Sequence, residues 1–268
     1  CCEFFERYAA KMRPEDEVLE AGLDDLAGAA RDPRLFDLAA DSGYSDSRKI
    51  DWVRGYSLTS PKAVWVPANL VFLPYRPGRK DKRIAKGDSN GLAAGNNIEE
   101  AVLHGILEVV ERDALIIAEY NRLPMREIDP EGLPAVILDM LSRLTVEGYT
   151  ASLRLMPTDL PITVISAFLR SDADPADCSV AVGCHLDPNV ACERALTEAV
   201  QLLPPTSNQE EWYRLGDPGR YLDRSPVPIS LGSIPDRASP DLKANIEMCV
   251  DFLRAAGAEI IVVDLSLT

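Results

Sequence analysis

The sequence is poor in the side chains that bind zinc. It has two histidines, and its six cysteines include no Cys-x-x-Cys pair, so a four-ligand zinc site is not expected. The adjacent Cys1 and Cys2, together with the high apolar content, fit buried thiols in a reducing compartment better than disulfides. We therefore expect free cysteines.

Long apolar runs are also missing. No stretch approaches the roughly 20 apolar residues that cross a membrane, and no charged leader precedes an apolar segment at the start. We therefore expect a cytoplasmic protein with no membrane contact. The sequence starts at Cys1 instead of Met and stops abruptly at Thr268, so we expect residues to be missing at both ends.

Positive charge is scarce as well. Lys and Arg number 28 against 43 Asp and Glu, which gives a net charge of −15. Free nucleic acid is therefore a poor candidate partner, because its affinity depends on cationic contacts to phosphate. An acidic protein that handles phosphate would need divalent cations.

The remaining composition is that of a globular α/β protein. Apolar residues make up 46% of the chain and charged residues 26%. Periodicity predicts helices at 1–12, 16–29, 97–120, 134–146, 187–203 and 240–256, and strands at 63–68, 70–73, 150–155, 162–169, 178–184 and 260–265. This order favours the α/β (α+β) class, with mixed β-sheets covered by helices. No linker interrupts it, so we expect residues 1–268 to form a single domain.

Two further segments stand out. Residues 30–60 are turn-rich and polar. Residues 89–96 form a turn of small residues that leads directly into the helix at 97–120, with Asn96 or Asn97 as the N-cap.

One polar pattern occurs twice. Residues 3–9 read EFFERYA and residues 108–114 read EVVERDA. Positions i, i+3 and i+4 share a helix face, so each segment directs two carboxylates and one guanidinium to the same side. A third helix carries Arg194, Glu198 and Gln201 on one face in the same way.

Intrahelical ion pairing is the simpler interpretation of each pattern alone. The pairs Glu3–Arg7 and Glu108–Arg112 have i, i+4 spacing, which stabilises an exposed helix by about 0.3 to 0.5 kcal/mol per pair. The repetition and the third stripe favour a different interpretation. Clustered glutamates hold Mg²⁺, Mg²⁺ bridges phosphate oxygens, and arginines contact the remaining oxygens.

The string SNGLAAGNNIEEAVLHGILEVVERD, residues 89–113, resembles the signature of the YcaO family. The segment from Glu3 to Arg7 is similar to the first ExxER element of that family, and RALTEAVQ (194–201) is similar to its third element. The resemblance implies a YcaO-type fold with an internal pseudo-repeat, and a stand-alone member of the archaeal type.

The resemblance also implies an activity. A backbone amide of a peptide is activated by phosphorylation of its carbonyl oxygen with Mg-ATP, and a sulfur nucleophile then attacks, which gives a thioamide. An azoline-forming cyclodehydratase is the alternative enzyme. A non-catalytic nucleotide-binding scaffold that recruits a peptide partner is an alternative of another class.

Site residues follow from the same resemblance. The metal ligands would be Glu3, Glu6, Glu108, Glu111 and Glu198, of which Glu108, Glu111 and Glu198 would also be the catalytic residues. The nucleotide would contact Arg7, Asn96, Glu100, Arg112, Arg194 and Gln201. Implied partners are a peptide or protein substrate, a TfuA-type protein and a second copy of the chain.

Two features stay open between a structural and a functional interpretation. His104 could assist proton transfer, but we interpret it as a packed or hydrogen-bonded histidine. The dense basic run comprises Arg79, Lys80, Lys82, Arg83 and Lys86. We interpret this run as a solvated loop, with a lid over the triphosphate or a dock for an acidic peptide as alternatives.

Overall fold

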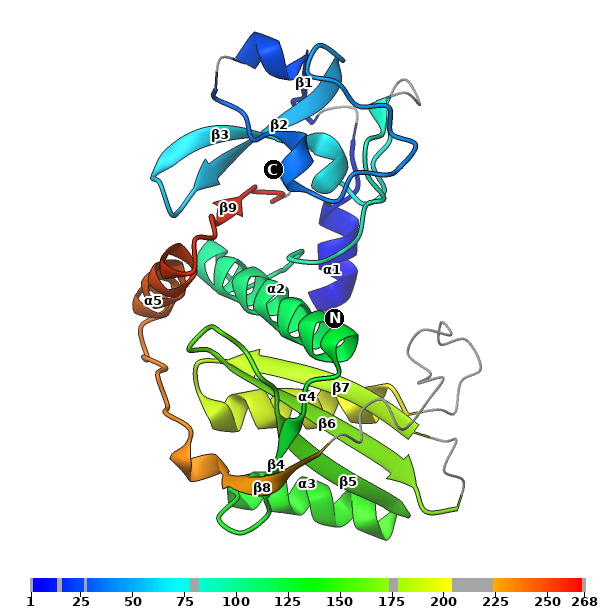
Figure 1. Cartoon of the computed structure of the whole chain (residues 1–268), viewed down its shortest axis with the longest axis vertical. Helices are drawn as coiled ribbons and strands as arrows, with labels where there is room; N and C mark the ends of the chain where they lie inside the picture. Colours follow the sequence, from blue (N-terminus) through cyan, green and yellow to red (C-terminus); the bar gives the residue numbers. More distant parts are fainter. Residues whose placement is uncertain are drawn as a thin grey trace. The chain divides into compact units, whose positions relative to one another are not determined.

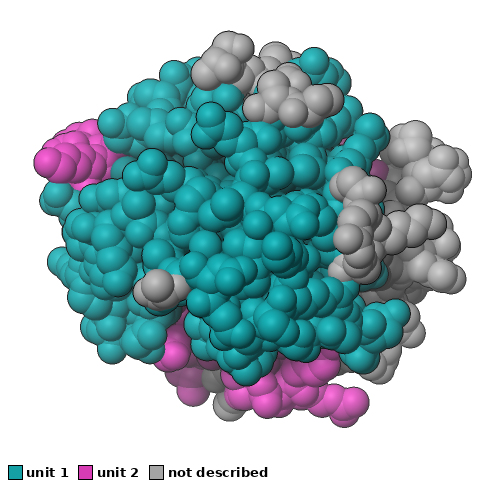
Figure 2. All heavy atoms as spheres, turned by 90° about the horizontal axis from the view of Figure 1, so that it is seen from above, with its two compact units in different colours: residues 1–106, 246–268 teal, residues 107–245 magenta. Residues whose placement is uncertain are grey.

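The computed structural model describes residues 2–13, 16–26, 28–77, 82–173, 178–203 and 224–266 (Figure 1). The chain divides into two compact units (Figure 2). Residues 1–106 and 246–268 form the first unit, and residues 107–245 form the second. The first unit is therefore built from two pieces that are distant in the sequence.

The first unit contains an antiparallel sheet in the order β1-β2-β3, with β9 also paired to β2. These strands are β1 (Leu19–Ala21), β2 (Ile50–Ser57), β3 (Lys62–Pro67) and β9 (Ile261–Val262). Neighbouring residues of a strand point to opposite faces. Trp52 accordingly packs in one apolar cluster with Ile84, while Val53 packs in another with Phe72. Both faces of the sheet thus carry apolar packing, although Arg54 and Tyr56 of β2 are exposed.

The first unit also contains four short helices in its described residues. Helix α1 (Cys2–Ala9) precedes β1, and the 3-10 helices are η1 (Leu23–Leu26), η2 (Pro33–Leu35) and η3 (Ala68–Leu70). Of these, η1 and η2 connect β1 to β2.

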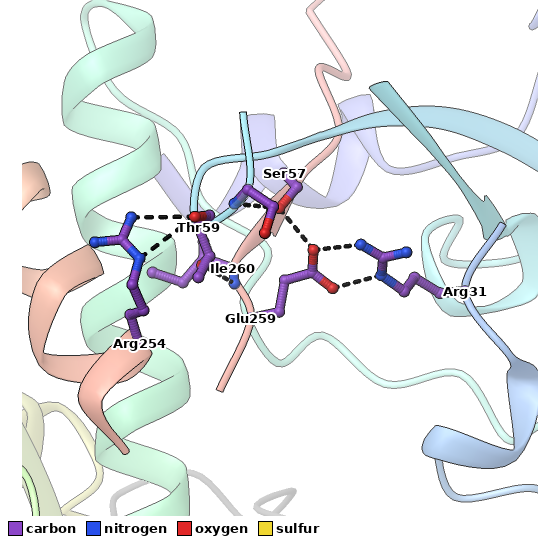
Figure 3. A network of polar contacts seen from close by, with 7 residues as sticks. Arg31, Ser57, Thr59, Arg254, Glu259 and Ile260 are labelled. Carbon is purple, nitrogen blue, oxygen red and sulfur yellow. Dashed lines mark hydrogen bonds and ion pairs between the residues drawn. The ribbon is translucent and has the colours of Figure 1, made fainter. Parts of the chain in front are cut away.

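Within the first unit, a polar network joins the C-terminal segment to the N-terminal piece (Figure 3). The guanidinium of Arg31 donates to both carboxylate oxygens of Glu259, and Ser57 Oγ donates to Glu259 Oε1 at 2.7 Å. The hydrogen bonds from Arg31 hold the pKa of Glu259 below its usual value. Arg254 donates to the carbonyl of Thr59 at 3.1 Å, and the Ile260 N–H donates to Thr59 Oγ1 at 2.9 Å. These contacts join two pieces of the first unit that lie about 200 positions apart in the sequence.

The second unit contains a five-stranded sheet in the order β7-β6-β5-β4-β8. Its strands are β4 (Met125–Asp129), β5 (Tyr149–Leu155), β6 (Thr163–Ser171), β7 (Cys178–His185) and β8 (Arg224–Ser230). All neighbours are antiparallel except β4 and β8, which are parallel. The sheet is therefore mixed.

Helices α3 (Ala135–Val146) and α4 (Pro188–Gln201) pack against the apolar cluster of this sheet. Asp187 is the N-cap of α4, where its side chain accepts from the Asn189 N–H at 2.8 Å. The approach of α4 to β7 depends on Gly183. A Cβ there would lie 2.3 Å from the Ala191 carbonyl oxygen and 2.6 Å from the Ala195 nitrogen.

Helix α2 (Ile98–Asn121) and helix α5 (Leu242–Ala255) are the two helices that contribute residues to both units. Asn97 is the N-cap of α2, since its Oδ1 accepts from the Glu100 N–H at 2.8 Å. The 3-10 helix η6 (Leu231–Ser233) follows β8.

The predicted α/β class with mixed sheets and covering helices is confirmed, and so are the central helices and strands. The helix predicted at 16–29 is wrong, because this segment forms β1 and η1. The strand predicted at 70–73 is also wrong, because η3 and a turn occupy this region. Strand β2 lies inside residues 30–60, which the sequence pattern presents as turns.

The interpretation of the basic run as a solvated loop is wrong for Lys82. Its ammonium lies 2.7 Å from Asp51 Oδ1, which is buried, and also contacts Glu20. Arg83 donates to the carbonyl of Tyr75 at 2.8 Å. Arg79 and Lys80 lie outside the described residues. Lys82 and Arg83, two of the five cations, therefore form bonds to other parts of the chain.

Two expected absences concern membranes and disulfides. Across the described ranges, no helix has the length and apolarity that a membrane span requires. Cys178, Cys184, Cys192 and Cys249 form no disulfide, and the last three are buried. Cys1 and the side chain of Cys2 lie outside the described part of the structure.

Candidate functional site

The residues predicted from the sequence fall into one group in each unit. In the first unit, α1 and the turn before α2 meet at Ala94, whose N–H donates to Glu6 Oε1 at 3.2 Å. Two residues further on, Asn96 is fixed by Glu100. Both the backbone N–H and the side-chain amide of Asn96 donate to Glu100 Oε2, each at 2.8 Å. The structure therefore brings Glu6, Asn96 and Glu100 to the same turn, which we call the Asn96 turn (residues 89–97).

Two other predicted residues belong to α1. Arg7 lies on this helix and is exposed. Glu3 lies on the same helix, but its side chain is outside the described part of the structure. The i, i+4 pair expected between them stays a prediction.

In the second unit, α2 carries Glu108, Glu111 and Arg112. The guanidinium of Arg112 lies 3.9 Å from Glu108 Oε1 and 3.8 Å from Glu111 Oε1. Both distances exceed that of a hydrogen bond. The expected intrahelical pair therefore exists only as a loose ion pair, in which one guanidinium is shared by two carboxylates.

Helix α4 supplies the second set of side chains. Glu198 and Arg194 are close enough to Glu111 for their charges to act on its ionisation. Arg194 also donates to the carbonyl of Cys184 at 3.4 Å, which ties its side chain to the end of β7. Gln201 is exposed at the last position of α4. The structure thus brings α2 and α4 together at Glu111 and Glu198.

Glu111 is the most perturbed carboxyl of this group. The pKa of Glu111 is raised to about 8, chiefly by burial and next by the negative charge of Glu198, while Arg112 and Arg194 oppose the shift. The side chain of Glu111 is 11% exposed, compared with 27% for Glu108. A buried carboxyl beside a second carboxylate is a site where an added cation is favoured.

This pKa predicts a pH-dependent stability of the metal-free protein. The folded pKa of about 8 exceeds the ordinary value of 4.5. The contribution of Glu111 to stability is therefore fully present below pH 4.5 and is lost as the pH rises through about 8. In EDTA, we expect Glu111→Gln to raise the Tm by several degrees at pH 9 and to change it little at pH 5.

The matched control is Glu99→Gln, which alters an exposed glutamate in the first turn of the same helix. Thermal unfolding of both variants between pH 5 and 9 makes the comparison. A Tm difference between wild type and Glu111→Gln that stays constant with pH would contradict the prediction.

The donor set fits Mg²⁺ in its chemistry. Carboxylate oxygens are the ligands that Mg²⁺ prefers, and phosphate oxygens complete its octahedral shell. Among the residues that the structure describes, no three His, Cys, Asp or Glu side chains are arranged as a ready metal site. The fit therefore rests on the raised pKa of Glu111 beside Glu198, which a divalent cation would reverse.

His104 contacts the backbone of the Asn96 turn. Its Nδ1 lies 3.3 Å from the carbonyl oxygen of Ala94, across from the contact between Ala94 and Glu6. The interpretation of His104 as a hydrogen-bonded histidine is confirmed. The sequence signal for this contact is the position of His104, one helical turn after Glu100 on the helix that follows a turn of small residues.

These features define an α/β protein whose longest helix carries paired carboxylates and an arginine next to a second polar helix. The chain belongs to the YcaO family, described as a cyclodehydratase that binds ATP and Mg²⁺, and the match covers residues 1–268. This confirms the resemblance inferred from the motifs.

Two relatives share much of the sequence. An uncharacterized protein of Methanothermobacter thermautotrophicus is 31% identical over 282 residues, which cover 98% of this chain and 73% of that protein. A protein encoded in the tfuA 3′ region of Rhizobium leguminosarum bv. trifolii is 37% identical over 166 residues, which cover 58% of this chain and 39% of that protein.

Two solved structures share the fold over 99% of this chain. YcaO from Methanopyrus kandleri, bound with AMPPCP and Mg²⁺, has 27% identity and a TM-score of 0.77, and this chain covers 70% of it. The heterocyclase TruD has 26% identity and a TM-score of 0.85, and this chain covers 42% of it. This chain therefore spans less than half of the TruD chain.

Proposed function

We propose that the chain is a Mg-ATP-dependent enzyme that converts a backbone amide of a peptide into a thioamide. The amide oxygen attacks the γ-phosphorus of ATP and ADP leaves. Hydrosulfide then adds to the activated carbon, and the oxygen departs with phosphate. Amide, ATP and hydrosulfide thus become thioamide, ADP and phosphate.

The observation that carries the proposal is the pairing of Glu111 on α2 with Glu198 on α4, beside Arg112 and Arg194. Bound Mg²⁺ would neutralise the triphosphate and bridge its oxygens. Phosphoryl transfer is mainly a matter of positioning and charge neutralisation, so little covalent chemistry is required of the protein. Arg112 and Arg194 are assigned here to the phosphate oxygens.

The remaining residues complete the proposed roles. We assign Glu3, Glu6, Glu108, Glu111 and Glu198 to the metal, with Glu108, Glu111 and Glu198 also acting catalytically. Arg7, Asn96, Glu100, Arg112, Arg194 and Gln201 are assigned to the nucleotide. The nucleotide complex of the M. kandleri relative supports a role in ATP binding.

The choice of thioamide over azoline rests on the relatives. The relative encoded in the tfuA 3′ region supports a TfuA-type partner. The likeness to TruD supports the alternative, an azoline-forming cyclodehydratase in which a Cys, Ser or Thr side chain of the substrate is the nucleophile. A non-catalytic scaffold would retain the ATP site without turnover.

Phosphate release separates these functions. The purified chain is assayed with Mg-ATP and a peptide, with and without sulfide, and with and without a TfuA-type protein. We expect release that depends on both peptide and sulfide, and a product heavier than the substrate by the exchange of oxygen for sulfur.

Each other result selects another function. Sulfide-independent release with loss of water from the peptide would identify the azoline enzyme. Binding of AMPPCP without any turnover would identify the scaffold and contradict the proposed activity.

A further inference from the structure

The Asn96 turn is held to α2 through the Ala94 peptide unit. The N–H of Ala94 donates to Glu6, and its carbonyl oxygen lies 3.3 Å from Nδ1 of His104. A carbonyl oxygen can only accept a hydrogen bond, so Nδ1 must carry the proton in this contact. The contact therefore fixes the orientation of the imidazole and, in the neutral ring, leaves Nε2 as the acceptor.

Asn96 is oriented by the same logic. Glu100 Oε2 accepts from the side-chain amide of Asn96 at 2.8 Å, and a carboxylate offers no proton in return. The amide nitrogen of Asn96 must therefore point toward α2, and its Oδ1 must point away from Glu100. The position of the turn thus decides where Asn96 presents its carbonyl group.

The turn lies against α2 without free space. A Cβ at Gly95 would be 2.6 Å from the backbone nitrogen of Ala101, and a Cβ at Gly105 would be 2.9 Å from the carbonyl oxygen of Gly91. Such contacts leave the turn little freedom to approach α2 further. The hydrogen bonds of His104 and Glu100 keep the turn from moving away from α2.

We propose that His104 is a positioning residue for nucleotide binding, acting through Ala94 on the Asn96 turn. This inference rests on the proposed function, in which Asn96 contacts ATP. His104 lies on α2, the helix that also carries Glu100, and it bonds to the backbone carbonyl of Ala94, two residues before Asn96.

The test compares His104→Ala with His104→Asn. Asparagine places an N–H donor near the position of Nδ1, whereas alanine removes the donor. We expect His104→Ala to raise the KM for ATP about 3- to 10-fold, as the loss of one neutral hydrogen bond implies, with kcat changed less than about 2-fold. His104→Asn should restore most of the loss.

The control is Glu99→Gln, which alters an exposed side chain on the same helix as His104. Its KM for ATP should equal that of the wild type. If His104→Ala instead leaves KM unchanged, or reduces kcat about 100-fold with a pH dependence that His104→Asn does not rescue, the positioning role is overturned.

A second measurement does not need activity. Hydrogen exchange of residues 89–97 is followed in the nucleotide-free protein. We expect faster exchange in His104→Ala and wild-type exchange in His104→Asn; equal exchange in all three proteins would overturn the inference. If the wild type shows no ATP turnover, the proposed function fails, while the exchange data still decide whether His104 holds the turn.

Discussion

Glu198→Gln is expected to abolish ATP-dependent turnover and leave the fold intact. Glu198 lies near the buried Glu111, and the two carboxylates are the proposed metal ligands. Glutamine keeps the size of the side chain but loses the charge, so binding of a divalent cation weakens and the triphosphate is no longer neutralised. We expect turnover to fall at least about 100-fold, a loss typical for the removal of one transition-state contact.

Thermal unfolding distinguishes this role from a structural one. Removal of the Glu198 charge relieves repulsion on Glu111, so the Tm of the metal-free variant should not decrease. Glu193→Gln makes the same chemical change five positions earlier on α4 and should retain activity. Normal turnover together with a large loss of Tm would show that Glu198 stabilises the fold and does not act on metal.

Gly183→Ala is expected to have the largest effect on stability. The added Cβ would meet the backbone of α4 at Ala191 and Ala195, at 2.3 and 2.6 Å. Backbone atoms of a helix cannot move aside as a flexible side chain can, so β7 and α4 must separate. We expect a loss of about 3 kcal/mol or more, which lowers the Tm by about 10 °C.

Gly232→Ala is the matched control in the same unit. The nearest atom to its added Cβ is Ser230 Oγ at 3.8 Å, an ordinary contact. Urea unfolding of both variants gives the comparison, and Gly232→Ala should stay within about 1 kcal/mol of wild type. Wild-type stability of Gly183→Ala would show that α4 lies farther from β7 than these two distances require.

The helices of the candidate site could be predicted from sequence because their signals are local. Asp187 and Pro188 mark the start of α4, and Asn97 caps α2 next to the motif. The spacing within each helix also decides which polar side chains share a face. That Glu111 would be buried beside Glu198 could not be predicted in this way, because it depends on how two helices pack.

Strand β2 shows the opposite case. Its sequence IDWVRGYS interrupts the apolar alternation with Asp51, which is buried only because Lys82 and Tyr75 bind it. These partners lie 31 and 24 residues away, so no local pattern reports them. The same network explains why Lys82, within a basic run, is not solvated.

The acidic segment that follows α1 was predicted as a helix for a similar reason. Leu19, Leu23 and Leu26 have helical spacing, but Leu19 pairs with Trp52 across the sheet, and Gly22 lies against the backbone at Asp46. A remote strand therefore overrides the local preference.

The ion pair between Arg31 and Glu259 has a consequence for biosynthesis. During translation, the partner of Arg31 leaves the ribosome only after the whole of residues 107–245 has been made. The second unit can thus fold before β9, which pairs with β2 in the first unit, has been synthesised. Ribosome-attached chains that stop short of Glu259 would be expected to show protease resistance in the later-synthesised unit before the earlier one.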